Sequence, residues 1–212
     1  QYSLVNNRFK KKFKQRKYKG KLIIPSLNNY LDLKPKIKNR YLKLDINDEN
    51  MAFVFLLSKL LKISKKDFLN SLKTFKGLPH RYEIFLKKKN CIFINDSKAT
   101  TFQATKYALK NTKNIFWIVG GQPKKNEKIL LKSLKKNIVK SYLIGKNINF
   151  FKKQIKFNVE YFIAGNLKNS IVQIMRDIRT QNRKNNSILL SPASASYDQF
   201  SNFEDRGNKF KK

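Results

Sequence analysis

The feature that most constrains the fold is a regular alternation of short apolar runs and helical segments over residues 81–191. Runs with strand character lie at 81–86, 91–95, 114–120, 140–145, 159–163 and 186–191. Helical patterns are predicted between them at 102–110, 125–135, 148–153 and 167–179. Such alternation is typical of an α/β fold, so we predict an open, mainly parallel sheet with helices on both faces.

The residues before this region are predicted to form a separate domain. They contain two strand-like runs, 21–25 and 41–45, and two helical segments, 48–63 and 64–75. The first helix is apolar around most of its circumference and should be well buried, and Ser64 should cap the second. Gly77 and Pro79 then break the pattern, so we predict domains at 1–76 and 77–212.

The chain is strongly basic, with a formal net charge of +35. Such a charge predicts attraction to polyanions, and a basic nucleic-acid-binding module centred on residues 8–21 is our alternative hypothesis. However, 40 of the 48 basic residues are Lys, spread along the chain, whereas recognition of bases and phosphates favours Arg. We therefore attribute most of the charge to compositional drift at solvated positions and do not expect nucleic acid as a partner.

Cysteine content and the length of the apolar runs indicate the compartment. The single Cys91 lies in an apolar run and cannot form an internal disulfide, which suits a reducing cytoplasm. Apolar runs such as 51–57 are far shorter than the roughly 20 residues needed to cross a bilayer. We predict a cytoplasmic, monomeric protein without membrane insertion and, because the chain begins with Gln1, a piece of a longer one.

Polar clusters follow several of the predicted strands. They read "NDSKATT" (95–101), "GGQPKKNE" (120–127) and "SPASASYDQF" (191–200), and "GLPHR" (77–81) leads into the first strand. Ligands of such sheets bind beyond the carboxyl ends of the strands, where helix N-termini and loop amides converge. Asp96 has an alternative interpretation as a cap of the helix beginning near Thr101. One His and one Cys cannot build a zinc site, so the residues alone predict an anion-binding α/β domain with an unspecified substrate.

Four blocks in this order resemble the Mur ligase family, in particular its members that add D-glutamate. They are "GLPHRYE" (77–83), "INDSKAT" (94–100), "VGGQPKK" (119–125) and "LLSPASASYDQFSNFEDRGNKF" (189–210). The resemblance covers 47–212 well and 1–46 poorly. It implies that 1–76 is the end of a central α/β ATPase domain and that 77–212 is a Rossmann-like C-terminal domain. The second and fourth blocks speak against another amino-acid-adding or a folylpolyglutamate synthase-like enzyme.

The resemblance implies a ligase of peptidoglycan precursor synthesis that uses ATP and Mg²⁺. Its small-molecule substrates would be ATP, D-glutamate and UDP-N-acetylmuramoyl-L-alanine, whose terminal carboxylate is first phosphorylated. The D-glutamate amine then attacks this acyl phosphate, a good leaving group, while nearby cations stabilise the developing charge. The chain lacks the phosphate loop, the Mg²⁺ ligands and the UDP-binding domain, so by itself it should be inactive.

The resemblance also assigns roles to particular residues. Nucleotide binding is implied for Asn47, Asn50, Arg81 and Asp96, a catalytic role beside the reacting phosphate for Lys98, and D-glutamate binding for Thr100, Lys124, Ser196, Tyr197 and Phe203. No metal ligand is implied within this chain. Three positions depart from the family pattern, because Ile46 replaces the usual His, Thr101 the usual Asn and Tyr197 the more frequent Leu.

Overall fold

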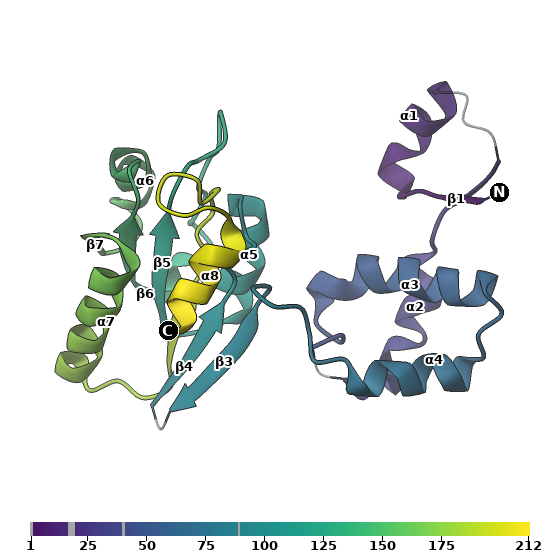
Figure 1. Cartoon of the computed structure of the whole chain (residues 1–212), viewed down its shortest axis with the longest axis horizontal. Coiled ribbons are helices and arrows are strands. Elements are labelled where there is room, and N and C mark those ends of the chain that lie inside the picture. The colour runs from purple at the N-terminus through teal and green to yellow at the C-terminus, as the bar shows by residue number, and fades with distance from the viewer. Residues whose placement is uncertain (1, 17–19, 40, 89) are drawn as a thin grey trace. The chain divides into compact units, whose positions relative to one another are not determined.

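The computed structural model describes residues 2–16, 20–39, 41–88 and 90–212. The chain divides into two compact units, a first unit that ends at Gly77 and a second unit, Leu78–Lys212 (Figure 1). Each unit has its own buried apolar core.

The second unit is built on a six-stranded sheet with the strand order β3-β4-β8-β5-β6-β7. β3 runs antiparallel to β4, and every other neighbouring pair is parallel. The strands are β3 (Glu83–Lys88), β4 (Cys91–Asn95), β5 (Ile115–Gly120), β6 (Ile138–Ile144), β7 (Tyr161–Gly165) and β8 (Asn186–Leu190). The prediction of a mainly parallel sheet is confirmed.

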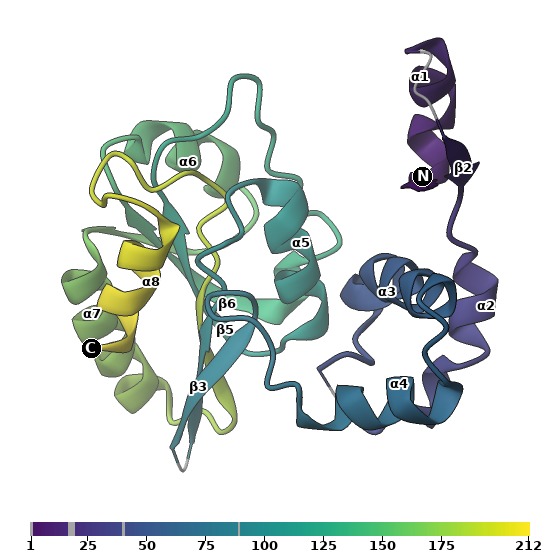
Figure 2. The same ribbon diagram turned by 45° about the vertical axis from the view of Figure 1, so that its right-hand side comes forward.

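Helices cover both faces of this sheet, as predicted. They are α5 (Phe102–Asn111), α6 (Ile148–Ile155), α7 (Leu167–Gln181) and α8 (Phe203–Lys211). Side chains of α5 and α6 share one core with Trp117 and Val119, whereas those of α7 and α8 share another with Phe116 and Ile118. Successive β5 residues therefore enter opposite cores, as the two-residue period of a strand requires. Figure 2 shows α7 and α8 together on one face.

The helix predicted at 125–135 is wrong. The segment is irregular up to a short 3₁₀ turn, η5 (Lys135–Asn137), although Leu131 and Leu134 are buried in the core. Its main chain bonds to a side chain of another element: the Ile129 amide donates to Gln154 Oε1 (2.6 Å). Such tertiary hydrogen bonds replace the helical ones, so apolar spacing alone gave the wrong answer here.

The first unit consists of short elements around a small core. They are β1 (Tyr2–Leu4), η1 (Asn7–Phe9), α1 (Lys10–Gln15), β2 (Lys21–Ile23), α2 (Leu27–Leu31), η2 (Lys34–Lys36), η3 (Asp45–Asn47), α3 (Asp48–Leu60), α4 (Lys65–Ser71) and η4 (Leu72–Thr74). Tyr30, Met51 and Phe55 form part of the core. The strand predicted at 21–25 and both helices are present, and Ser64 caps α4 as predicted.

Two expectations for the first unit are wrong. Residues 41–44 form turns and Asp45 begins η3, so no strand is present at 41–45, because the main chain bonds locally, as in the Leu44 amide donating to the Tyr41 carbonyl (3.2 Å). α3 is not buried all round: Met51 and Phe55 face the core, but Val54 and Leu57 are each 45% exposed. The first unit therefore covers only one face of this helix.

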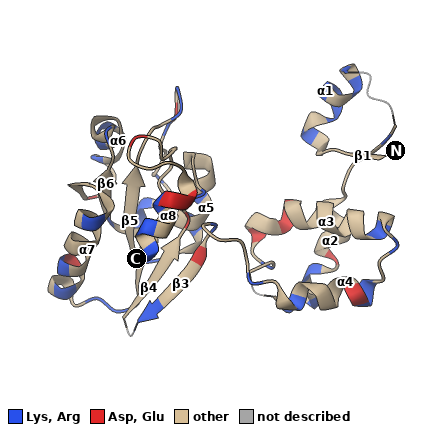
Figure 3. Cartoon of the chain, viewed as in Figure 1, with Lys and Arg blue, Asp and Glu red and all other residues tan. Residues whose placement is uncertain are grey.

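Basic residues lie on elements of both units (Figure 3). Among the residues that the structure describes, no helix combines the length and the apolar character needed to cross a bilayer. The thiol of Cys91 is buried, and burial raises its pKa.

Candidate functional site

The polar loops of the second unit meet at one edge of its sheet. The parallel strands β4, β5 and β8 end there at Asn95, Gly120 and Leu190, and β3 begins there because Glu83 pairs with Asn95. We call this edge the rim. Of the predicted site residues, Arg81 precedes β3, Asp96, Lys98 and Thr100 follow β4, Lys124 follows β5, Ser196 and Tyr197 follow β8, and Phe203 begins α8.

Hydrogen bonds join the three rim loops into one body. The Gln122 amide donates to the Ala195 carbonyl (2.9 Å), and the Ala195 amide donates back to the Gln122 carbonyl (3.0 Å). Ser191 Oγ donates to Asp96 Oδ2 (2.7 Å), and the Asp96 amide donates to the Leu190 carbonyl (2.8 Å). The loops after β4, β5 and β8 are therefore held together, as the sequence predicted for loops at one edge.

Asp96 is a buried carboxyl group at the centre of the rim. Only 7% of the residue is exposed, and burial raises its pKa to about 7. Its oxygens accept from the Tyr82 amide (3.1 Å) and the Ser191 hydroxyl. These two hydrogen bonds and the positive charge of Arg81 lower the pKa of Asp96, but the effect of burial is larger. The alternative role as a helix cap is wrong, because Thr101 caps α5.

Lys98 points out of the rim and Ser97 points into it. The Lys98 ammonium lies 3.6 Å from the centroid of the Phe203 ring, a cation–π contact that fixes its position. Ser97 is fully buried, and its hydroxyl donates to the Phe203 carbonyl (2.8 Å). The two neighbours therefore do not form a nucleophile–base pair, and Lys98 presents a cation at the surface.

Arg206 is a rim residue that the sequence interpretation missed. Its guanidinium is fully buried and donates to Ser97 Oγ (3.0 Å), the Ser97 carbonyl (2.8 Å) and the Ser194 carbonyl (3.1 Å). Burial lowers its pKa to about 10. Arg206 thus connects the loop after β4 to the loop after β8 through hydrogen bonds to both. Arg206 lies inside the 189–210 block, but no pattern in the neighbouring sequence distinguishes a buried Arg from an exposed one.

The residues predicted for D-glutamate differ in exposure. Thr100 is half-buried, and Lys124 is exposed at the β5 loop. Ser196 is 2% exposed, and its carbonyl accepts from the Gln199 and Phe200 amides. Tyr197 is 70% exposed, so its side chain lies at the surface.

Asn47 and Asn50 belong to the first unit. Asn47 is buried, and its Nδ2 donates to the Tyr41 carbonyl (2.7 Å). Asn50 is exposed on the first turns of α3. The Asn47 amide group is therefore used within its own unit, whereas that of Asn50 faces solvent.

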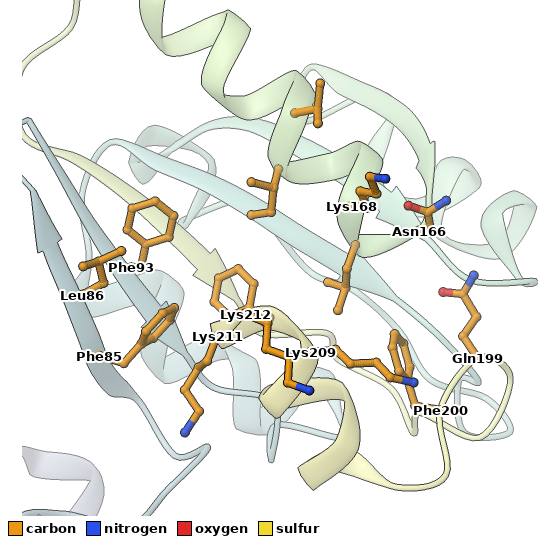
Figure 4. Close-up of a pocket in the computed structure, with 14 residues that line it drawn as sticks. Phe85, Leu86, Phe93, Asn166, Lys168, Gln199, Phe200, Lys209, Lys211 and Lys212 are labelled. Carbon is orange, nitrogen blue, oxygen red and sulfur yellow. The ribbon is translucent and has the colours of Figure 1, made fainter.

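An apolar pocket of about 690 Å³ lies elsewhere in the second unit (Figure 4). It is lined by β3, β4, α7 and the end of α8, and Phe85, Phe93 and Phe210 contribute to its wall. None of the predicted site residues lines it. In the part of the chain that the structure describes, no group of three or more His, Cys, Asp or Glu side chains could hold a metal ion.

Comparison with known proteins identifies the family. No protein-family model matches the chain. The UDP-N-acetylmuramoylalanine–D-glutamate ligase of Wolbachia sp. subsp. Brugia malayi (strain TRS) is 38% identical over 172 residues, which is 80% of this chain and 34% of that protein. The chain belongs to the Mur ligase family.

Other Mur ligases show the same pattern. The ligase of the same name from Nitrobacter hamburgensis is 38% identical over 78% of this chain and 35% of its own length. That from Rickettsia felis is 35% identical over 82% of this chain and 39% of its own length. The chain thus spans a little over a third of the length of the curated relatives it matches.

Solved structures share the fold. The bifunctional folylpolyglutamate synthase/dihydrofolate synthase from Yersinia pestis CO92 superposes with a TM-score of 0.53 over 79% of this chain and 39% of that chain. A structure of this enzyme complexed with AMPPNP and Mn ion gives the same TM-score. At 14% sequence identity this likeness shows the fold alone, and it agrees with the predicted α/β class.

Proposed function

We propose that the chain is part of an ATP-dependent ligase that adds D-glutamate to UDP-N-acetylmuramoyl-L-alanine during peptidoglycan precursor synthesis. The proposal is supported by identities of 35–38% to ligases of this name over about four fifths of the chain. Residues 1–76 would be the end of the central ATPase domain and 77–212 the C-terminal domain. We further propose a cytoplasmic, monomeric enzyme.

The single structural observation that supports this function is that hydrogen bonds connect the three rim loops, which follow β4, β5 and β8. Loops that hold a nucleotide and an amino acid must keep their separation fixed, because the reacting atoms have to approach to about 3–3.5 Å. The Gln122–Ala195 pair and the Arg206 guanidinium provide such rigidity within the rim. A domain with unrelated polar loops would not need these cross-links.

At the nucleotide end, Arg81 would contact the nucleotide and Asp96 would accept a hydrogen bond from the ribose. Because burial raises the pKa of Asp96 to about 7, this carboxyl group is a better acceptor at higher pH. Lys98, held over the Phe203 ring, would stabilise the negative charge that develops during phosphate transfer and acyl attack.

At the amino-acid end, Thr100 and Lys124 would hold the D-glutamate α-carboxylate. The Ser196 hydroxyl and the main chain of Tyr197 and Phe203 would hold its side-chain carboxylate. The described residues offer no cluster of ligands that fits Mg²⁺. Asn47 and Asn50 remain proposed nucleotide contacts of the first unit.

The decisive experiment is an assay of the protein encoded by the complete reading frame around this sequence. We expect a phosphate-binding loop upstream and phosphate release from ATP that requires both D-glutamate and UDP-N-acetylmuramoyl-L-alanine. Lys124→Ala should raise the KM for D-glutamate by tenfold or more, from the loss of about 1.5–3 kcal/mol, with little change in the KM for ATP. Turnover with another amino acid in place of D-glutamate would identify a different amino-acid-adding ligase.

A further inference from the structure

His80, the only histidine of the chain, is buried beside the rim without a role in the proposed chemistry. It is 6% exposed and adopts a left-handed backbone conformation, with φ 62°. This conformation is uncommon outside glycine, although Asn, Asp and His adopt it more often than other residues, and it persists where the surroundings hold it.

The protonation state of His80 follows from its partner Asn95. The Asn95 amide orientation is fixed by two main-chain groups, because its Nδ2 donates to the Gly207 carbonyl (3.1 Å) and its Oδ1 accepts from the Ser97 amide (3.2 Å). Nδ2 also lies 3.0 Å from His80 Nδ1 and can only donate. His80 Nδ1 therefore accepts, which makes the imidazole neutral with its proton on Nε2.

The main chain of His80 links the start of β3 to the loop after β4. The His80 amide donates to the Glu83 carboxylate (2.9 Å), and its carbonyl accepts from the Lys98 amide (2.9 Å). Arg81 is the next residue along the chain. The ring of His80 also meets the Phe203 ring edge-on at 6.1 Å and lies against Gly207, where a methyl group would collide with Nδ1.

We propose that His80, as the neutral Nε2–H imidazole held by Asn95 and Gly207, is a positioning residue that sets the main chain of Arg81 and Lys98. The proposal rests on the proposed function only in that these two residues are taken to meet the nucleotide. His80 itself touches no reacting group. It acts through the peptide groups that it holds.

The charged groups around His80 determine how it responds to pH. Burial and the Lys211 ammonium of α8 lower its pKa, whereas the carboxylates of Glu83 in β3 and Glu204 in α8 act in the opposite direction. A proton on Nδ1 would face the Asn95 amide hydrogens and break the contact. The positioning is therefore complete above the unfolded-state pKa of about 6.5 and is lost as the pH falls through the folded-state pKa of His80, which lies below that value.

The first test is nitrogen NMR of the imidazole in the 212-residue chain, where a single histidine gives one pair of ring signals. We expect Nδ1 to be unprotonated and Nε2 protonated, with a titration midpoint below that of a free histidine. A ring with its proton on Nδ1, or an ordinary midpoint with averaged tautomers, overturns the proposal.

A matched pair of variants then separates positioning from simple bulk. His80→Asn tolerates the left-handed conformation and carries its oxygen at the place of Nδ1, whereas His80→Gln carries its amide at the place of Nε2. We expect His80→Asn to keep the hydrogen exchange of the Lys98 amide near the wild-type rate, and His80→Gln to accelerate it about tenfold. Equal rates in both variants contradict the role of the Nδ1 acceptor.

Titration of the protein encoded by the complete reading frame, which should include the phosphate-binding loop, with the ATP analogue AMPPNP separates this proposal from the proposed function. AMPPNP should shift the Arg81 and Lys98 signals in the wild type and in His80→Asn with similar affinity. If His80→Gln binds AMPPNP at least tenfold more weakly, the positioning role and the nucleotide site are both supported. Equally tight binding by His80→Gln overturns the positioning role and leaves the nucleotide site standing. If no variant responds to AMPPNP while the tautomer and exchange results hold, the nucleotide assignment fails and the positioning of the two peptide groups stands.

Discussion

Two ionisable side chains of the rim, Asp96 and Arg206, are buried and held by hydrogen bonds instead of an ion pair. Within the described part of the chain, neither has an oppositely charged group within salt-bridge distance. Burying a charge without such a partner costs free energy, and proteins tolerate it mainly where the group serves a site. Each residue therefore gives a stability prediction of its own.

Replacing Asp96 by Asn should stabilise the fold at high pH. The folded-state pKa of about 7 lies above the unfolded value of about 3.9, so the folded state binds the proton more tightly and loses stability as the pH rises between these values. The difference corresponds to about 4 kcal/mol at most. Asp96→Asn keeps the hydrogen-bonding shape because the Ser191 hydroxyl can reverse its direction.

Urea unfolding at pH 8 and near pH 4.5 measures this effect. We expect Asp96→Asn to be more stable than the wild type at pH 8, with the gain shrinking towards the lower pH. An equal difference at both pH values would show that burial does not destabilise the Asp96 carboxylate.

Replacing Arg206 by Met should destabilise the second unit by about 3 kcal/mol or more, because buried carbonyls of Ser97 and Ser194 lose their donors. Arg206→Lys should cost nearly as much, since an ammonium keeps the charge but cannot span the same acceptors. Arg176→Met, at an exposed position of α7, is the matched control and should stay within about 0.5 kcal/mol of wild type. Thermal unfolding measures all three, and a wild-type-like Arg206→Lys would contradict this connection of the two loops.

At the scale of elements, sequence patterns predict a strand correctly where burial makes its own residues apolar. β5 is buried on both faces along its whole length, so its apolar run left no alternative to a central strand. The spacing of Leu131 and Leu134 predicts a helix over 125–135, but the Ile129 amide bonds to Gln154 of a distant element and the segment is irregular. Patterns of single residues cannot report partners that only folding brings together.

The same limit explains which rim residues could be predicted. Asp96 and Lys98 stand in a polar cluster directly after a strand, which is a local signal. Arg206 and His80 gain their positions from contacts with residues 109 and 15 positions away, respectively, and no local signal marks them. The resemblance to Mur ligases supplied specific roles, which the geometry of the rim alone does not.

One helical position of α8 gives a prediction with an unusual sign. Alanine in a helix interior is normally about 1 kcal/mol more favourable than glycine. Gly207→Ala should nevertheless destabilise the second unit, because the added methyl group would collide with His80 Nδ1 and crowd Asn95 Oδ1. Asn208→Ala, at the exposed neighbouring position, should leave the melting temperature unchanged or slightly raised. A higher melting temperature for Gly207→Ala would mean that α8 does not pack closely on His80.

For the whole molecule, the charge of +35 and the proposed ligase function lead to different expectations for binding. A basic element such as α1, whose Lys10, Lys11 and Lys12 are all exposed, is the best local candidate for nucleic-acid contact. However, dispersed lysines attract polyanions without arranging them, and the Lys-rich composition extends over both units (Figure 3). The rim, in contrast, combines buried hydrogen bonds with a few placed charges.

Salt dependence distinguishes these two kinds of binding. A nucleic-acid-binding surface that neutralises six or more phosphates loses about 10³-fold or more in affinity between roughly 50 and 200 mM salt. We expect a labelled DNA 20-mer to bind this chain with a Kd above about 1 μM at physiological salt. Substitution of Lys10, Lys11 and Lys12 by Gln should weaken this DNA binding only by the small amount that the loss of any three positive charges would cause. Fluorescence anisotropy with single- and double-stranded probes measures both quantities. Submicromolar DNA binding that depends on those three lysines would mean that the charge of this chain has been selected for a polyanion, because compositional drift has no reason to concentrate affinity on one short helix.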